Sequence, residues 1–141
     1  MRSTDLKYRG YGDAKPLDFL KSTVPLGKHI VTNPPYGTHG LGDAFVRRAL
    51  KHCQQTGGSV AMLLNLRSLC NPKRSWKFRK TPPHTIYLID ELTCWPEGKP
   101  QAWGSRIARQ QYYWAVWHPR KRGEKIVPKV WWLSPSEFRQ P

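Results

Sequence analysis

Cysteine, acidic residues and long apolar runs are all scarce in this sequence of 141 residues. Its three cysteines, Cys53, Cys70 and Cys94, are widely spaced and form neither a Cys-x-x-Cys pair nor a Cys/His cluster with metal-site spacing. This argues against a zinc site, and the odd number fits a reducing compartment better than a disulfide framework. We therefore expect a cytoplasmic protein with no bound metal.

No segment has the composition of a membrane or secretion signal. The residues that follow Met1 contain no apolar run of the kind that a signal peptide needs. The longest apolar stretch, residues 60–66, is far too short to cross a bilayer. We therefore expect no membrane partner, and the length predicts a single domain over residues 1–141.

Basic residues greatly outnumber the scarce acidic ones. The chain has 24 Lys and Arg against 9 Asp and Glu, which gives a net charge of +15. Such an excess predicts a polyanionic partner, most commonly a phosphate backbone, although it is also compatible with a basic protein that is merely soluble. Seven tryptophans are interleaved with this charge and suit stacking on unpaired bases, but for Trp114 and Trp117 we prefer packing in the core. We expect a nucleic acid, with DNA favoured, as the partner.

Apolar segments and turn residues alternate in an order typical of an α/β domain. Residues 1–28 are polar and rich in turns, and the basic stretch 67–83 ends in two prolines. A helix is expected from Asp43, which can cap it, to a stop before the glycine pair at 57 and 58. Strands are expected at 29–32, 59–66, 85–90, 111–118 and 127–133. This order predicts a mostly parallel sheet whose ligand lies at the carboxyl ends of the strands.

The tetrapeptide Asn33-Pro34-Pro35-Tyr36 follows the first expected strand directly. Methylating an exocyclic amine requires two hydrogen-bond acceptors that turn its delocalised lone pair toward the methyl donor. The Asn33 side-chain oxygen and the Pro34 carbonyl would be these acceptors, held rigid by the consecutive prolines, and Tyr36 would give the target ring an aromatic face. A base would have to leave the helical stack to reach them. The alternative is a rigid loop with a packed tyrosine.

The tetrapeptide and its setting resemble motif IV of the amino-methyltransferases, [Asp/Asn/Ser]-Pro-Pro-[Tyr/Phe]. From about residue 5 to residue 117 the chain looks like the phage and prophage DNA adenine methyltransferases. The resemblance implies a Rossmann-like class I methyltransferase sheet, S-adenosylmethionine as cofactor, adenine N6 in DNA as target, and a bacterial or phage-infected cell. Asn-Pro-Pro-Tyr is also used by enzymes that methylate glutamine side chains and some RNA bases. The net charge of +15 favours a nucleic acid over a protein as the target. The residues that carry the wider resemblance are Ser3-Thr4-Asp5-Leu6, Gly10-Tyr11-Gly12, Asp18-Phe19-Leu20, and the segments 44–50 and 113–117.

Further site residues follow from this resemblance and from the charge. By resemblance, Asp5 would bind the cofactor ribose, and Asp18 would lie near the cofactor adenine with Phe19 beside it; each aspartate could instead be a solvated cap. The charge density after residue 66 favours a groove for the target strand over a solvated surface loop. The residues of this expected groove are Arg67, Lys73, Arg74, Trp76, Lys77, Arg79 and Lys80.

The chain departs from the family at its N-terminus. Members of the family place a strand and a glycine-rich turn before the ribose-binding acidic residue, whereas only four residues precede Asp5 here. We therefore expect an N-terminally truncated sheet made of a partial cofactor-side segment (1–28), a catalytic segment (29–66) and a basic target-side region (67–141). The missing strand would expose an edge beside the catalytic strand.

That exposed edge leaves several outcomes open. The N-terminal segment could refold across the gap, or the edge could pair with a second copy or a complementing chain. The chain could also be a degenerate, non-catalytic nucleic-acid-binding module, or a decoy subunit that dimerises with an intact methyltransferase.

Overall fold

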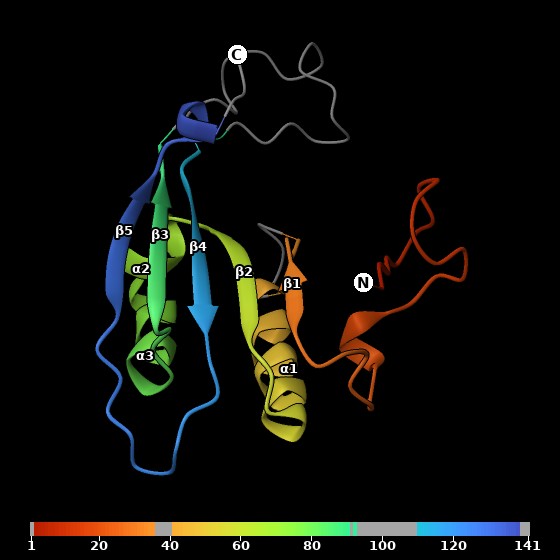
Figure 1. The fold of residues 1–141 in the computed structure, drawn as a ribbon, viewed down its shortest axis with the longest axis horizontal. Helices are drawn as coiled ribbons and strands as arrows, with labels where there is room; N and C mark the ends of the chain where they lie inside the picture. Colours follow the sequence, from red (N-terminus) through yellow and green to blue (C-terminus); the bar gives the residue numbers. More distant parts are fainter. Residues whose placement is uncertain (1, 36–40, 91, 93–109, 139–141) are drawn as a thin grey trace.

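The computed structural model describes residues 2–35, 41–90, 92 and 110–138 as a five-stranded mixed sheet with helices on one face (Figure 1). Along the chain the elements are η1 (Phe19–Lys21), β1 (Ile30–Thr32), α1 (Leu41–Thr56), β2 (Val60–Asn65), α2 (Arg67–Cys70), α3 (Pro72–Lys80), β3 (Thr85–Ile89), β4 (Tyr112–Trp117), β5 (Lys129–Leu133) and η5 (Pro135–Phe138). The strands and helix α1 lie close to the segments expected from the sequence, whereas α2 and α3 form where only a basic stretch is expected.

The strands are ordered β1-β2-β4-β3-β5. β1 is parallel to β2 and β3 is parallel to β5, but β4 runs antiparallel to both of its neighbours. β1, β2, β3 and β5 therefore run in one direction, as expected of a mostly parallel sheet, but β4 departs from this because it runs back along β3 and fills the position between β3 and β2. Apolar patterning predicts that a segment is a strand, but it does not encode the direction in which the strand enters the sheet.

The main core lies between the sheet and the helices. Ala49 and Cys53 of α1 pack against one face of β2 and β4, and Phe78 of α3 stacks on Trp117 of β4 with ring centroids 6.3 Å apart. Trp117 is 3% exposed, which confirms its expected place in the core. The buried members of this core are Ala49, Cys53, Val60, Met62, Leu64, Ile86, Tyr113, Ala115 and Trp117.

The basic stretch after β2 forms two short helices, α2 and α3. Asparagine side chains stabilise both starts: Asn65 Oδ1 accepts from the Arg67 N–H at 3.0 Å and Asn71 Oδ1 accepts from the Lys73 N–H at 2.9 Å. Such bonds satisfy amide groups that the first turn of a helix leaves unpaired. The packing of Phe78 then holds α3 on the same face of the sheet as α1.

The segment before β1 is anchored on the turn between α1 and β2. The Lys28 carbonyl accepts from Thr56 Oγ1 at 3.0 Å and lies 3.6 Å from Cys53 Sγ. Burial raises the pKa of the Cys53 thiol, so the group stays protonated and can donate. A Cβ on Gly58 would fall 1.5 Å from the same carbonyl, so this contact requires glycine.

A buried hydroxyl pair links β4 to α2. The Tyr113 hydroxyl lies 2.8 Å from Ser68 Oγ, and Tyr113 is fully buried. Burial, partly offset by this hydrogen bond, raises the pKa of Tyr113, so the phenol stays protonated.

We expect Tyr113→Phe to lower the free energy of unfolding by about 1 kcal/mol, because it leaves the Ser68 hydroxyl buried without its partner. Urea unfolding of Tyr113→Phe, Ser68→Ala and the double variant measures this. The double variant should lose less stability than the two single losses combined. Additive losses would mean that the two hydroxyls do not stabilise each other.

The described helices give no membrane span. None is both long and apolar enough to cross a bilayer.

Candidate functional site

The Asn33-Pro34-Pro35 segment lies at the carboxyl end of β1. β1 pairs in parallel with β2, and Thr32 is level with Met62, so the loop leaves the sheet beside the later half of β2. The chain then enters α1 and returns through β2. The expected strand, loop, helix and strand around the tetrapeptide are therefore present, in the position where open α/β sheets carry ligands.

The side chains of this loop differ in exposure. Pro34 is fully buried, whereas Asn33 and Pro35 are exposed. Gly42, near the start of α1, lies so close that a Cβ there would be 3.9 Å from the Pro35 carbonyl. Pro34 is thus packed inside the fold near the start of α1, while the neighbouring Asn33 is exposed. Tyr36, the last residue of the tetrapeptide, lies outside the described residues.

β1 is an edge strand. Among the described residues it pairs with β2 alone, and Val31 at its centre is 70% exposed. Residues 2–28 lie on this side of the molecule without forming a strand (Figure 1). The described part of the segment therefore does not pair with the outer side of β1, and pairing with a second copy or a complementing chain stays a prediction.

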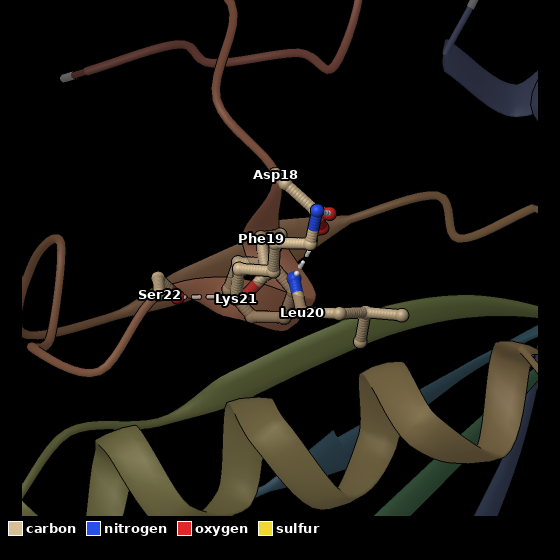
Figure 2. A network of polar contacts seen from close by, with 5 residues as sticks. All are labelled: Asp18, Phe19, Leu20, Lys21 and Ser22. Carbon is tan, nitrogen blue, oxygen red and sulfur yellow. Dashed lines mark hydrogen bonds and ion pairs between the residues drawn. The ribbon is translucent and has the colours of Figure 1, made fainter.

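Asp18 caps the short helix η1. Its Oδ1 accepts from the Leu20 N–H at 3.0 Å and its Oδ2 lies 3.6 Å from Lys21 Nζ, while Ser22 Oγ donates to the Phe19 carbonyl at 2.6 Å (Figure 2). These contacts all lie within residues 18–22, and both oxygens of the Asp18 carboxylate take part in them.

Phe19 attaches this segment to α1. Its ring stacks on Phe45 with centroids 5.1 Å apart and meets His52 edge-on at 5.7 Å. The His52 Nε2 atom also lies 3.3 Å from the Ser22 carbonyl. In this structure Phe19 therefore packs η1 against the helix.

Asp5 lies in an exposed turn. Its Oδ1 accepts from the Lys7 N–H at 3.0 Å and its Oδ2 lies 3.7 Å from Arg9 Nε. The following Gly12 has a φ of +79° and lies against Ser3, whose carbonyl would be 2.6 Å from an added Cβ. Gly12 therefore permits a close contact with Ser3, a residue of the same N-terminal segment.

These observations test whether the segment suits S-adenosylmethionine. The cofactor needs a carboxylate for its ribose, a wall for its adenine and a glycine that lets backbone approach it. Asp5 and Asp18 are engaged locally, Phe19 packs on α1, and Gly12 meets Ser3. As they lie, these residues do not fit the cofactor, and their binding roles stay predictions.

The expected nucleic-acid groove lies on α2 and α3. The side chains of Arg67, Lys73, Arg79 and Lys80 are exposed, while those of Arg74, Trp76 and Lys77 lie outside the described atoms. The expected site residues thus belong to helices on the same face of the sheet as α1. Their contact with nucleic acid stays a prediction.

A second cluster, which the sequence did not reveal, lies at the opposite end of the sheet from Asn33. His84 and His118 have ring centroids 5.3 Å apart, and the His118 N–H donates to His84 Nδ1 at 3.1 Å. Burial first, and then the charge of His118, lower the pKa of His84, so that ring is neutral at pH 7. The two histidines help to line a pocket of about 410 Å³, together with Thr85, Lys125, Ile126, Val127 and Lys129.

Comparison with known proteins adds little to this geometry. No protein-family model matches the sequence, and no curated protein matches it. A crystal structure from Listeria monocytogenes, of a protein described as a class I S-adenosylmethionine-dependent methyltransferase, is similar at 10% identity with a TM-score of 0.49. The match covers 82% of this chain and 39% of that one. A likeness this distant does not assign a function, which must be argued from the chain's own residues.

Proposed function

We propose that the chain takes part in S-adenosylmethionine-dependent methyl transfer to an exocyclic amino group in nucleic acid, with adenine N6 in DNA as the target. The observation that carries the proposal is the exposed Asn33 amide beside the buried Pro34, at the carboxyl end of a strand in a parallel pair. In this position the rigid backbone of the two prolines can hold the Asn33 side-chain oxygen as an exposed hydrogen-bond acceptor.

In this proposal the loop binds and orients the target amine. The Asn33 side-chain oxygen accepts one amino proton, and the Pro34 carbonyl, which is buried as the loop lies, has to become accessible to accept the other. Together the two bonds fix the direction of the nitrogen lone pair. The same two oxygens stabilise the positive charge that develops on the nitrogen. The prolines hold the backbone in place because their rings fix φ. Tyr36 is proposed to provide an aromatic face for the base.

The charge of the chain supports a nucleic acid as the molecule that carries the amine. The net charge is +15, and exposed basic side chains lie on α2 and α3. Attraction to phosphate would concentrate a polynucleotide at the protein surface, and the target base would then have to turn out of its stack.

A second candidate is a nucleic-acid-binding module that does not catalyse methyl transfer. The local engagement of Asp5 and Asp18 and the packing of Phe19 favour it, because these residues do not present a cofactor site as they lie. A second copy or a complementing chain along β1 is the arrangement in which the first candidate would still obtain its methyl donor.

Calorimetric titration with S-adenosylmethionine tests whether this chain alone can carry out the first candidate function. Methyl transfer by this chain predicts saturable binding, weakened in Asp5→Ala and unchanged in Asp13→Ala, which removes another N-terminal carboxylate paired with Arg2. Absence of binding up to millimolar cofactor would exclude autonomous catalysis and leave the second candidate, or methyl transfer that requires a complementing chain.

A further inference from the structure

Three aromatic residues form one row across the sheet. In the strand register Tyr87 of β3 is level with Trp114 of β4 on one side and with Trp131 of β5 on the other. Residues that are directly paired in neighbouring strands project from the same face of a sheet. The three side chains therefore lie next to one another on three adjacent strands.

This row lies on the face opposite the helices. The residue before Trp114, Tyr113, points the other way and packs in the core with Ala49 of α1. α1, α2 and α3 all lie on that side of the sheet (Figure 1), and within the described residues no helix covers the aromatic row. Trp131 is 56% exposed, while Tyr87 and Trp114 are half-buried. The row is thus most accessible at the β5 edge.

The pocket that His84 and His118 help to line lies at one end of the face that carries the aromatic row. Thr85 and Lys129 are level with each other, two residues before Tyr87 and Trp131, so they project from the same face in the next row. Two residues along a strand span roughly 7 Å. Both line the pocket with Lys125, His84 and His118, so a cationic pocket adjoins the aromatic row.

The loop that leads into β5 adds further positive charge. Residues 118–128 contain four exposed basic side chains and one acidic residue, Glu124, whose Oε2 accepts from the Lys121 N–H at 2.9 Å. The four basic residues are Arg120, Lys121, Arg122 and Lys125.

We propose that this face binds single-stranded nucleic acid, with bases stacked on Tyr87 and Trp131 and a backbone phosphate in the pocket of Lys125 and Lys129. Aromatic side chains stack on any unpaired base, and adjoining cations follow the phosphates. A duplex would hide the faces of its bases from the row. The site shares no residue with the Asn33 loop or with α2 and α3, so it goes beyond the proposed methyl transfer.

Fluorescence anisotropy with a labelled thymidine oligonucleotide tests the stacking. We expect Trp131→Ala to weaken binding ~10-fold or more, which is the usual effect of replacing an aromatic side chain on which a base stacks. Trp132→Ala is the matched control, because Trp132 is the next residue, is 73% exposed and projects from the other face. It should leave the affinity nearly unchanged. Circular dichroism and thermal unfolding establish that both variants fold.

Two further probes separate stacking from charge. A strand of the same length with abasic sites should bind more weakly than the thymidine strand, and Lys125→Ala/Lys129→Ala should reduce the slope of log affinity against log salt by about 1.4. Equal losses for Trp131→Ala and Trp132→Ala, equal affinity for the abasic strand, or equally tight binding of polyaspartate would each overturn the proposal. The thymidine strand has no adenine amino group for the Asn33 loop, so its binding reports on this face, and failure of methyl transfer and failure of this site are distinguishable.

Discussion

Asn33→Ala is expected to reduce methyl transfer to DNA on the order of 100-fold or more, because it removes one of the two acceptors that orient the amine and stabilise its developing charge. Asn33 is exposed, and its side chain forms no hydrogen bond within the described part of the chain. Its removal should therefore change the free energy of unfolding by no more than about 0.5 kcal/mol. Transfer of labelled methyl groups, followed at saturating cofactor, measures the rate.

Asn33→Asp is the matched variant, because a carboxylate keeps an acceptor oxygen at the same position. It should retain much more of the rate than Asn33→Ala, and both variants should bind S-adenosylmethionine as the parent does. Equal rate losses in the two variants, or a loss of cofactor affinity that matches the loss of rate, would contradict the role assigned to Asn33.

Gly58→Ala is expected to cause the largest loss of stability, about 3 kcal/mol, at the upper end of the usual cost of overpacking. The added methyl group would fall 1.5 Å from the Lys28 carbonyl, a backbone atom that Thr56 already holds. Relief of this clash would displace the segment that leads into β1, and with it the Asn33 loop. Urea unfolding measures the change.

Gly27→Ala serves as the control for Gly58→Ala. Gly27 lies in the same segment, but among the described residues an added Cβ there would meet only the His29 carbonyl, at an ordinary 3.7 Å. Its stability should be unchanged or slightly higher, because alanine restricts the unfolded chain. Equal stability of Gly27→Ala and Gly58→Ala would show that the Lys28 contact does not constrain the fold.

The sequence predicts the elements of the fold better than their arrangement. Apolar runs bounded by glycine and proline gave all five strands and α1, because burial in a sheet or against it requires that pattern. The direction of β4 depends on which neighbour it pairs with, which no local pattern contains. The sequence predicts only a basic stretch where α2 and α3 form, although Asn71, directly before Pro72, is a recognisable cap for α3.

The candidate sites also differ in how much of each one the sequence predicts. The position of Asn33 follows from a strand that ends at a proline pair, so the sequence predicts it directly. Asp18 is a different case: it caps a short helix, as aspartate before a turn commonly does, and its expected place near the cofactor stays a prediction. His84 and His118 lie 34 residues apart and meet only through the pairing of β3 with β4, so sequence spacing could not reveal their pocket.

The most direct test of the central claim is transfer of a tritiated methyl group from S-adenosylmethionine to DNA by the purified chain, followed by digestion to nucleosides. The account predicts label in N6-methyladenine, and none when purine without the 6-amino group replaces adenine. Absence of label from adenine at saturating cofactor, or label in another nucleoside, would contradict it.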